Sequence, residues 1–305
     1  MTEQKIDNAA AGAHTPAARV SVGADEIIAA ATALAWAARW DIAARMLASA
    51  RADQAGGATS RRLALVGAAV AVHHDFRTAD PRWAPDAMAC AEAATAPDPD
   101  VSSDPAPDAA QGLASWRLGL LRLQYDYEIA LTGTDGIPRF GPEGHDPARL
   151  TALAQRAEQL SAAIPDVAGA GWAAFYRGLI ADNLTGDRAG APRWFTRALD
   201  AAERAADDYL AGEALRHLGD HDEEAGNLPQ ARARWERSAE LWAGIGNITG
   251  VLAQQLLLAQ LAFREANAAA GTAIAAEVSR WAGAAGLVLY QRSADELIER
   301  RGPGR

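Results

Sequence analysis

The stretch LRHLGDHDEEAGNLPQARARWERS, residues 215–238, decides the fold of this 305-residue chain. Its centre holds the dipeptide Gly226-Asn227, and apolar or small residues recur three and four positions apart on both sides of it. Such spacing is typical of a helix with one buried face. Glycine followed by asparagine is typical of the end of one helix and the start of the next. The stretch therefore predicts two antiparallel helices joined by a short turn.

The same pattern returns at a fixed interval in the second half of the chain. Gly226-Asn227 stands forty residues after Gly186-Asp187 and forty residues before Ala266-Asn267. The other residues that match at this spacing are Gly178, Leu218 and Leu258; Ala191, Ala231 and Gly271; Phe195 and Trp235; and Ala198 and Ser238. Repetition at this period indicates stacked helical hairpins, with small residues where two helices approach closely and bulky residues between hairpins.

These residues resemble the tetratricopeptide-repeat (TPR) family. The family's units place a large residue before Leu-Gly, then Gly-Asp or Gly-Asn, an alanine, an aromatic residue and a second small residue. The resemblance is strongest for residues 207–246, extends over 171–206 and 247–285, and is weak before residue 165. It implies an all-α fold, an α-solenoid of stacked antiparallel hairpins, of the forty-residue type found in sensor regions of large bacterial regulators.

The composition agrees with an all-α chain. Alanine accounts for 77 of the 305 residues, and aromatic residues for only 6%. Alanine has the highest helix propensity and is a poor strand former, which argues against a sheet-rich fold. An alanine- and arginine-rich chain with the single lysine Lys5 also suggests a bacterial origin.

We expect a disordered tail at residues 1–22 and a single TPR-like domain at residues 23–300, with clear repeats from about residue 165. Helical periodicity predicts three further hairpins at residues 25–54, 60–95 and 111–163, and a capping helix at 287–300. The proline- and aspartate-rich segment 97–108 is predicted to be a loop, as is 133–146, where Phe140 could hold the loop against the surface.

Charge and motifs exclude several classes of function. The net charge of −10 argues against a nucleic-acid partner. The longest apolar run, residues 63–72, is about half a membrane span, and no signal sequence is recognisable, so we expect a cytoplasmic protein without a membrane partner. Lys5 cannot serve a phosphate-binding loop, and the signatures of zinc peptidases and serine hydrolases are missing. We therefore assign no catalytic residue, metal or cofactor.

In the TPR family the first helix of each hairpin lines the concave wall and contacts the ligand. Carried over to this chain, the resemblance implies a set of candidate binding residues in three successive units: Tyr176 and Arg177; Glu213, Arg216, His217, Asp220 and Glu223; and Gln260 and Arg264. A wall that is partly charged and partly apolar suits a peptide or an amphipathic small molecule. An ordinary solvated helix face is the alternative interpretation.

Histidines and aromatic residues provide further candidates. His217 and His221 are four residues apart and could hold a metal with a third ligand, but acidic neighbours of this kind are also common on solvated helices. His73 and His74 point about 100° apart on a helix, so only one can face a given ligand. The remaining candidates, on the predicted helix 111–131, are Trp116, Tyr125, Tyr127 and Glu128.

Four tryptophans stand at or beside repeat positions and are expected to be structural. They are Trp194, Trp235, Trp242 and Trp281, and the phrase Trp-Ala-Gly at 242 returns at 281, a spacing of 39.

Two functions remain open. The first is a non-enzymatic scaffold that recognises a peptide, protein or small effector in its concave groove. A second copy of the chain, in a homo-oligomer, is a further candidate partner. The second is a small-molecule-binding protein or enzyme of a bacterial biosynthetic pathway that uses a pocket in the N-terminal half. An enclosed, mostly apolar cavity with a few convergent polar groups would favour a small molecule, and an open wet channel would favour a peptide or protein.

Overall fold

The computed structural model describes residues 22–54, 56–96, 109–132 and 138–301. These residues form thirteen α-helices and one π-helical segment, and contain no strand. The predicted all-α architecture, with consecutive helices packed as in an α-solenoid, is confirmed. Of the predicted tail, residues 1–22, only Val22 is described, and the predicted loop 97–108 lies outside the described residues. Of the predicted loop 133–146, residues 133–137 lie outside them, and residues 138–146 form no helix or strand.

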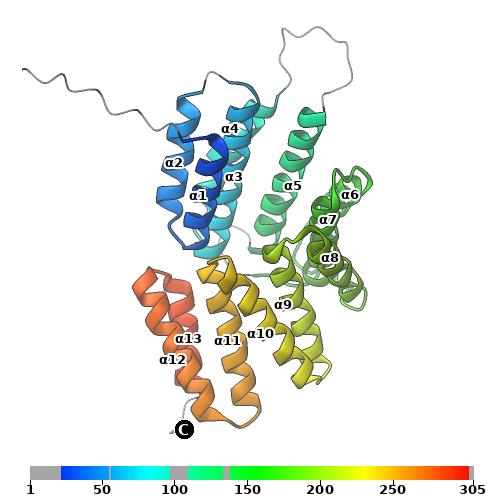
Figure 1. Cartoon of the computed structure of the whole chain (residues 1–305). Helices are drawn as coiled ribbons and strands as arrows, with labels where there is room; N and C mark the ends of the chain where they lie inside the picture. Colours follow the sequence, from blue (N-terminus) through cyan, green and yellow to red (C-terminus); the bar gives the residue numbers. More distant parts are fainter. Residues whose placement is uncertain (1–21, 55, 97–108, 133–137, 302–305) are drawn as a thin grey trace, which may run out of the picture.

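Six helices occupy the three hairpins predicted in the N-terminal half (Figure 1). Their bounds are α1 (Ala24–Trp36), α2 (Trp40–Ala52), α3 (Gly57–Thr78), α4 (Ala84–Thr95), α5 (Ala109–Thr132) and α6 (Pro147–Ala162). The second half contains α7 (Val167–Leu179) with the π-helical η1 (Ile180–Leu184), α8 (Ala191–Ala205), α9 (Asp208–Glu224), α10 (Leu228–Gly244), α11 (Ile248–Arg264), α12 (Ala268–Ala285) and the terminal α13 (Val288–Arg301).

The turns of the second half recur every twenty residues. A left-handed backbone conformation occurs at Gly186, Ala206, Gly226, Gly246, Ala266 and Gly286. The residue after each of the last five donates its backbone N–H to the carbonyl five positions earlier, as Asn227 does to Asp222 at 2.8 Å. This is the bond of a Schellman helix end. The forty-residue repeat therefore consists of two helix-plus-turn units of equal length. At two of the turns the left-handed residue is an alanine, Ala206 or Ala266, and this conformation costs an L-residue about 1–2 kcal/mol.

Glycines opposite aromatic rings explain the size pattern of the repeat. A Cβ on Gly212 would lie 2.3 Å from Nε1 of Trp242, and one on Gly219 would lie 2.5 Å from Nε1 of Trp235. Gly178 stands in the same relation to Phe195. The absent side chain lets the ring of the second helix lie directly on the backbone of the first helix.

Trp281, expected to be structural like Trp242, differs from it in burial. Trp242 is fully buried, whereas Trp281 is 51% exposed and donates its indole N–H to Glu277 at 2.6 Å. The spacing of 39 rather than forty residues explains the difference, because one residue turns the side chain by about 100° on a helix. Ala282, forty residues after Trp242, occupies the buried position.

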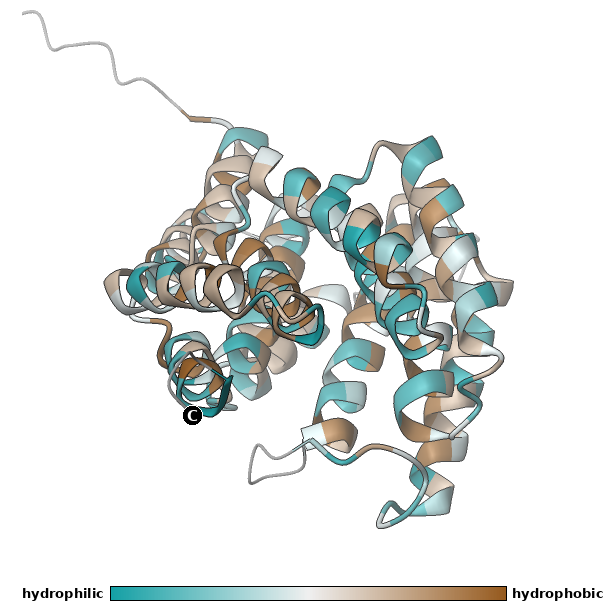
Figure 2. Cartoon of the chain, turned by 90° about the horizontal axis from the view of Figure 1, so that it is seen from below, coloured by the Kyte–Doolittle hydropathy of each residue, from teal (hydrophilic) through white to brown (hydrophobic). Residues whose placement is uncertain are grey.

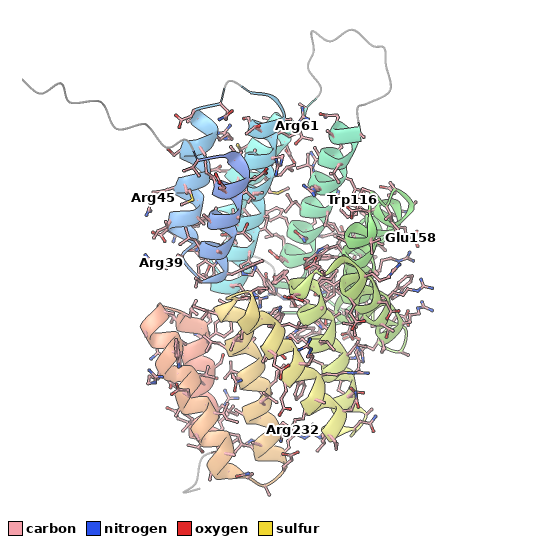
Figure 3. All side chains as sticks on the ribbon, viewed as in Figure 1. Arg39, Arg45, Arg61, Trp116, Glu158 and Arg232 are labelled. Atoms are coloured by element: carbon pink, nitrogen blue, oxygen red, sulfur yellow. The ribbon has the colours of Figure 1, made fainter. Side chains whose placement is uncertain are left out.

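The curved stack brings its first and last hairpins together. One hydrophobic cluster combines Trp40 and Leu63 from the N-terminal helices with Leu252, Val278 and Leu287 from the last helices. In Figure 1 the lower ends of α1 to α3 stand over the upper ends of α11 to α13. Figure 2 shows the helices arranged around the centre of the molecule, with hydrophilic and hydrophobic residues on every helix. Charged side chains such as Arg45 and Glu158 lie on the outside (Figure 3).

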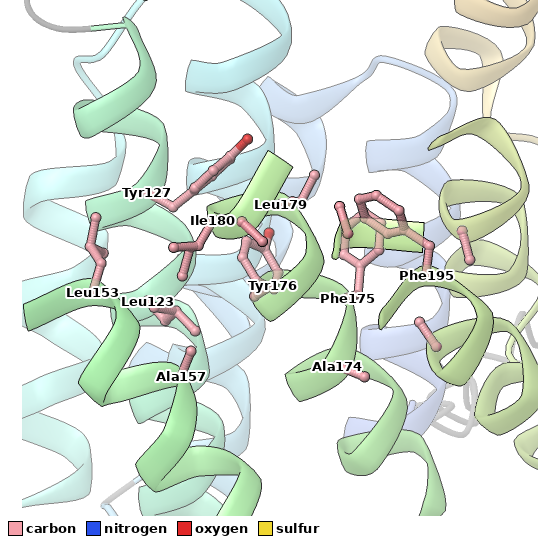
Figure 4. Packing of buried hydrophobic residues seen from close by; sticks show 14 of the residues in the cluster. Leu123, Tyr127, Leu153, Ala157, Ala174, Phe175, Tyr176, Leu179, Ile180 and Phe195 are labelled. Carbon is pink, nitrogen blue, oxygen red and sulfur yellow. The ribbon is translucent and has the colours of Figure 1, made fainter. Parts of the chain in front are cut away.

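The largest cluster of buried residues runs from α5 to α9 (Figure 4). Leu123, Leu153 and Ala157 join α5 to α6, and Phe175 and Phe195 join α7 to α8. No helix in the described parts of the chain combines the length and apolar character needed to cross a bilayer.

Candidate functional site

A cavity of about 790 Å³ lies at the centre of the stack. Residues of α1, α3, α5, α7, α9 and α11 line it, so each of the six hairpins contributes its first helix. This arrangement follows from the repeat, which turns the same helix of every hairpin inward. Exposed residues of the lining, among them Phe140, Arg188 and Glu224, lie where the cavity opens to solvent.

Seven of the nine candidate residues from the sequence lie on the cavity wall: Tyr176, Glu213, Arg216, His217, Asp220, Glu223 and Gln260. Arg177 does not. Its guanidinium lies over the ring of Trp194, 4.0 Å from the centroid, because the residue after Tyr176 points about 100° away from it. Arg264 is also outside the lining and forms an ion pair with Glu223.

Aromatic rings form much of the wall. Trp36 on α1 and Trp172 on α7 both contact Tyr209. Their ring centroids lie 6.2 and 5.7 Å from the centroid of the Tyr209 ring. Tyr176 lies edge-to-face with Tyr127 at 5.8 Å. Sequence reasoning missed three of these residues, namely Trp36, Trp172 and Tyr209. A signal was present, since Trp172 precedes Tyr176 by four residues and Tyr209 precedes Glu213 by four, which places each pair on one helix face.

An ion pair inside the cavity joins the two halves of the chain. Arg77 on α3 donates to Oε1 of Glu213 on α9 at 2.9 Å, and the side chains are 12% and 11% exposed. Arg77 was not among the residues selected from the sequence. Its guanidinium is permanently charged, so Glu213 is its counter-ion.

His73 lies beside this pair in a neutral state. Its Nδ1 is 3.4 Å from the hydroxyl oxygen of Tyr209, and its Nε2 is buried without a hydrogen-bond partner among the described residues. Burial, with repulsion from Arg77 and His74, lowers the pKa of His73 to about 3. The neighbouring His74 faces elsewhere, stacked on Trp83 at 3.9 Å. The expectation that only one of these two histidines can face a ligand agrees with this arrangement.

Glu128 on α5 also lines the cavity. Its carboxylate has no hydrogen-bond or ion-pair partner in the described part of the chain. Burial raises the pKa of Glu128 well above its usual range, with Arg77 opposing the shift and Asp75 adding to it. The residue as a whole is half-buried.

Of the other aromatic candidates on this helix, Tyr127 accepts a hydrogen bond from Asn183 Nδ2 at 2.6 Å on the cavity wall. Trp116 donates to the Leu160 carbonyl at 3.1 Å and packs on the core, and Tyr125 lies outside the lining.

The histidine pair on α9 is used in packing and in an ion pair. His217 stacks on Phe195 with centroids 4.8 Å apart and accepts a hydrogen bond from Arg216 at 3.0 Å. Burial lowers the pKa of His217 well below its ordinary value, so the ring is neutral. His221 Nε2 lies 3.4 Å from Asp182. The residues that the structure describes include no group of three or more histidine, cysteine, aspartate or glutamate side chains placed to hold a metal.

Comparison with known proteins adds no assignment. No family model matches this chain, and neither does any curated protein.

Proposed function

We propose that this protein binds a small organic molecule inside the central cavity. A volume of about 790 Å³ falls within the range of roughly 300–1,000 Å³ that is typical of small-molecule sites. The lining is mainly aliphatic and aromatic, and Arg77, Glu128 and Glu213 converge on it from three different helices. This combination of an apolar wall and a few convergent polar groups carries the proposal.

The contact between the first and last hairpins favours a compact ligand over a long peptide. An extended peptide needs a groove that is open along its length. Here the N-terminal helices contact the C-terminal ones in one hydrophobic cluster, and the Arg77–Glu213 pair connects α3 to α9. Both contacts shorten the free length of the concave surface.

We propose binding rather than catalysis. Two histidines line the cavity among the described residues, and His217 is stacked on Phe195. The other, His73, has a pKa of about 3, which makes it a weak base. As part of the same proposal, the protein is a TPR-like scaffold of the bacterial cytoplasm, in accordance with its repeat motif and composition.

Native mass spectrometry of the full chain tests this proposal. We expect a non-covalent adduct of small-molecule mass on the wild-type protein, either as purified or after incubation with a bacterial metabolite extract. Ala69→Trp should remove the adduct, because Ala69 is exposed on the cavity wall and a tryptophan there would occupy the space. Ala48→Trp is the matched control, since Ala48 is exposed on α2 outside the cavity.

Two results would overturn the proposal. One is a wild-type protein that carries no adduct under either condition. The other is an adduct that persists unchanged in Ala69→Trp, since it would then occupy another place on the molecule. Circular dichroism of both variants verifies that each remains folded.

A further inference from the structure

We propose that the ligand of the central cavity carries a positively charged nitrogen on an aromatic or apolar body, and that the Glu128 carboxylate binds this nitrogen. The inference rests on the proposed function and specifies the chemistry of the ligand. It follows from three features of the cavity: its balance of charge, the faces of its aromatic rings and the unpartnered carboxyl group.

The charges inside the cavity leave one carboxyl group without compensation. Arg77 and Glu213 neutralise each other through their hydrogen bond of 2.9 Å. His73 is neutral. The other acidic residues of the lining each have an arginine within 4 Å: Asp182, Glu213, Asp220, Glu223 and Glu224. Glu128 has no such partner in the described part of the chain, and no described side chain donates a hydrogen bond to it. A buried carboxylate without a partner is costly, and a ligand that supplies a cation or a donor removes that cost.

An anionic ligand would meet arginines that already have acidic neighbours. Arg77 donates through one NH2 group to Glu213, although its Nε–H has no hydrogen-bond partner among the described residues. The two other arginines of the lining also have acidic neighbours: Arg216 lies 3.9 Å from Asp220, and Arg188 lies 2.5 Å from Glu224. An anion at any of these arginines would compete with the carboxylate that is already there, whereas a cation at Glu128 displaces no existing partner.

The aromatic wall suits the same ligand. Five aromatic residues line the cavity together with Glu128 and contact one another in pairs: Trp36, Tyr127, Trp172, Tyr176 and Tyr209. The faces of such rings attract organic cations, with about 0.5–2 kcal/mol for each favourable contact. Their area also binds the apolar body of the ligand. A carboxylate among aromatic rings therefore favours an organic ammonium ion over a neutral molecule of equal size.

Proton release is a direct consequence of this mode of binding. The titratable and charged groups that face Glu128 are Arg77, His73 and Asp75 on α3, Tyr127 on its own helix, Tyr176 on α7, and Tyr209 and Glu213 on α9. Burial raises the pKa of Glu128 well above its usual range, while Arg77 opposes the shift and Asp75 adds to it. A bound cation favours the ionised carboxylate. Binding of an ammonium ligand should then expel a proton from Glu128 into the buffer.

Isothermal titration calorimetry of the full chain at pH 7 tests the inference with three probes that share an indole ring. Tryptamine is a cation, tryptophol is its neutral alcohol counterpart, and indole-3-acetate is an anion. We expect tryptamine to bind about tenfold or more tightly than tryptophol, and indole-3-acetate to bind most weakly. Titrations in phosphate and in Tris, which differ in ionisation enthalpy, should reveal proton release with tryptamine and none with tryptophol.

Glu128→Gln keeps the shape of the side chain and removes its charge. In this variant the preference for tryptamine and the proton release should both disappear, while tryptophol should bind as it does to the wild type. Glu240→Gln is the matched control, because Glu240 is exposed on the outer side of α10. It should behave as the wild type with all three probes.

Several outcomes would overturn the inference. These are equal or tighter binding of tryptophol, an unchanged preference in Glu128→Gln, or no binding of tryptamine at millimolar concentration. The proposed function is judged separately by mass spectrometry. An adduct that contains no basic nitrogen would support a ligand in the cavity and refute the cationic ligand, whereas the absence of any adduct would refute the proposed function itself.

Discussion

Arg77 and Glu213 are 136 residues apart in the sequence, and their side chains meet inside the cavity at 2.9 Å. Arg77 belongs to the second hairpin and Glu213 to the fifth. The contact is therefore a direct consequence of the curvature that has accumulated over the hairpins between them. It links the part of the chain with clear repeats to the part where the motif is weak.

Replacing Arg77 by methionine should destabilise the fold by about 3–5 kcal/mol, because it leaves Glu213 as a buried charge without a partner. The double variant Arg77→Met/Glu213→Met should lose less than Arg77→Met alone, since it removes both charges. Urea unfolding followed by circular dichroism at 222 nm measures both values. A double variant that is as unstable as Arg77→Met, or less stable, would contradict the prediction.

Acid should destabilise the protein through His73. Its folded-state pKa of about 3 lies below the ordinary value of 6.5. The unfolded chain therefore binds the proton first, and stability is lost as the pH falls from about 6.5 toward 3. His73→Gln should reduce the slope of unfolding free energy against pH by up to about 1.4 kcal/mol per pH unit in that window. Urea unfolding between pH 5 and 7 measures the slope; identical slopes in variant and wild type would contradict the prediction.

Two glycines within helices differ in what the methyl group added by an alanine substitution would contact. Gly212→Ala should cost about 1–3 kcal/mol, because the new Cβ would lie 2.3 Å from Nε1 of the fully buried Trp242. Gly67→Ala is the control. It lies within α3 with nothing near its virtual Cβ, so the higher helix propensity of alanine should raise stability by up to about 1 kcal/mol. Thermal unfolding compares the two, and equal effects would contradict the packing argument.

Two tryptophans of the repeat region should respond differently to truncation. Trp235 is 3% exposed, so Trp235→Ala should cost about 3–5 kcal/mol. Trp281 is 51% exposed, and Trp281→Ala should cost less than about 1 kcal/mol. Chemical denaturation of each variant against the wild type gives both values. A large loss for Trp281→Ala would indicate that its ring is covered in solution.

The candidate site could be predicted in part. The repeat motif placed Tyr176, Glu213 and Arg216 on the first helices, and these residues do lie on the cavity wall. The same motif also selected Arg177, one residue away and turned toward Trp194. Side-chain direction changes by about 100° per residue, so an error of one position in the alignment of a motif reverses the outcome.

The sequence by itself determined the helices, their turns and the forty-residue period. These depend on local chemistry: alanine propensity, apolar spacing, and glycine or asparagine at helix ends. Only the tertiary structure decided that Arg77 meets Glu213, that Glu128 borders the same cavity, and that the first and last hairpins touch. Each small rotation between neighbouring hairpins adds to the next. The position of residues more than a hundred apart depends on the sum of those rotations, which no single stretch of sequence encodes.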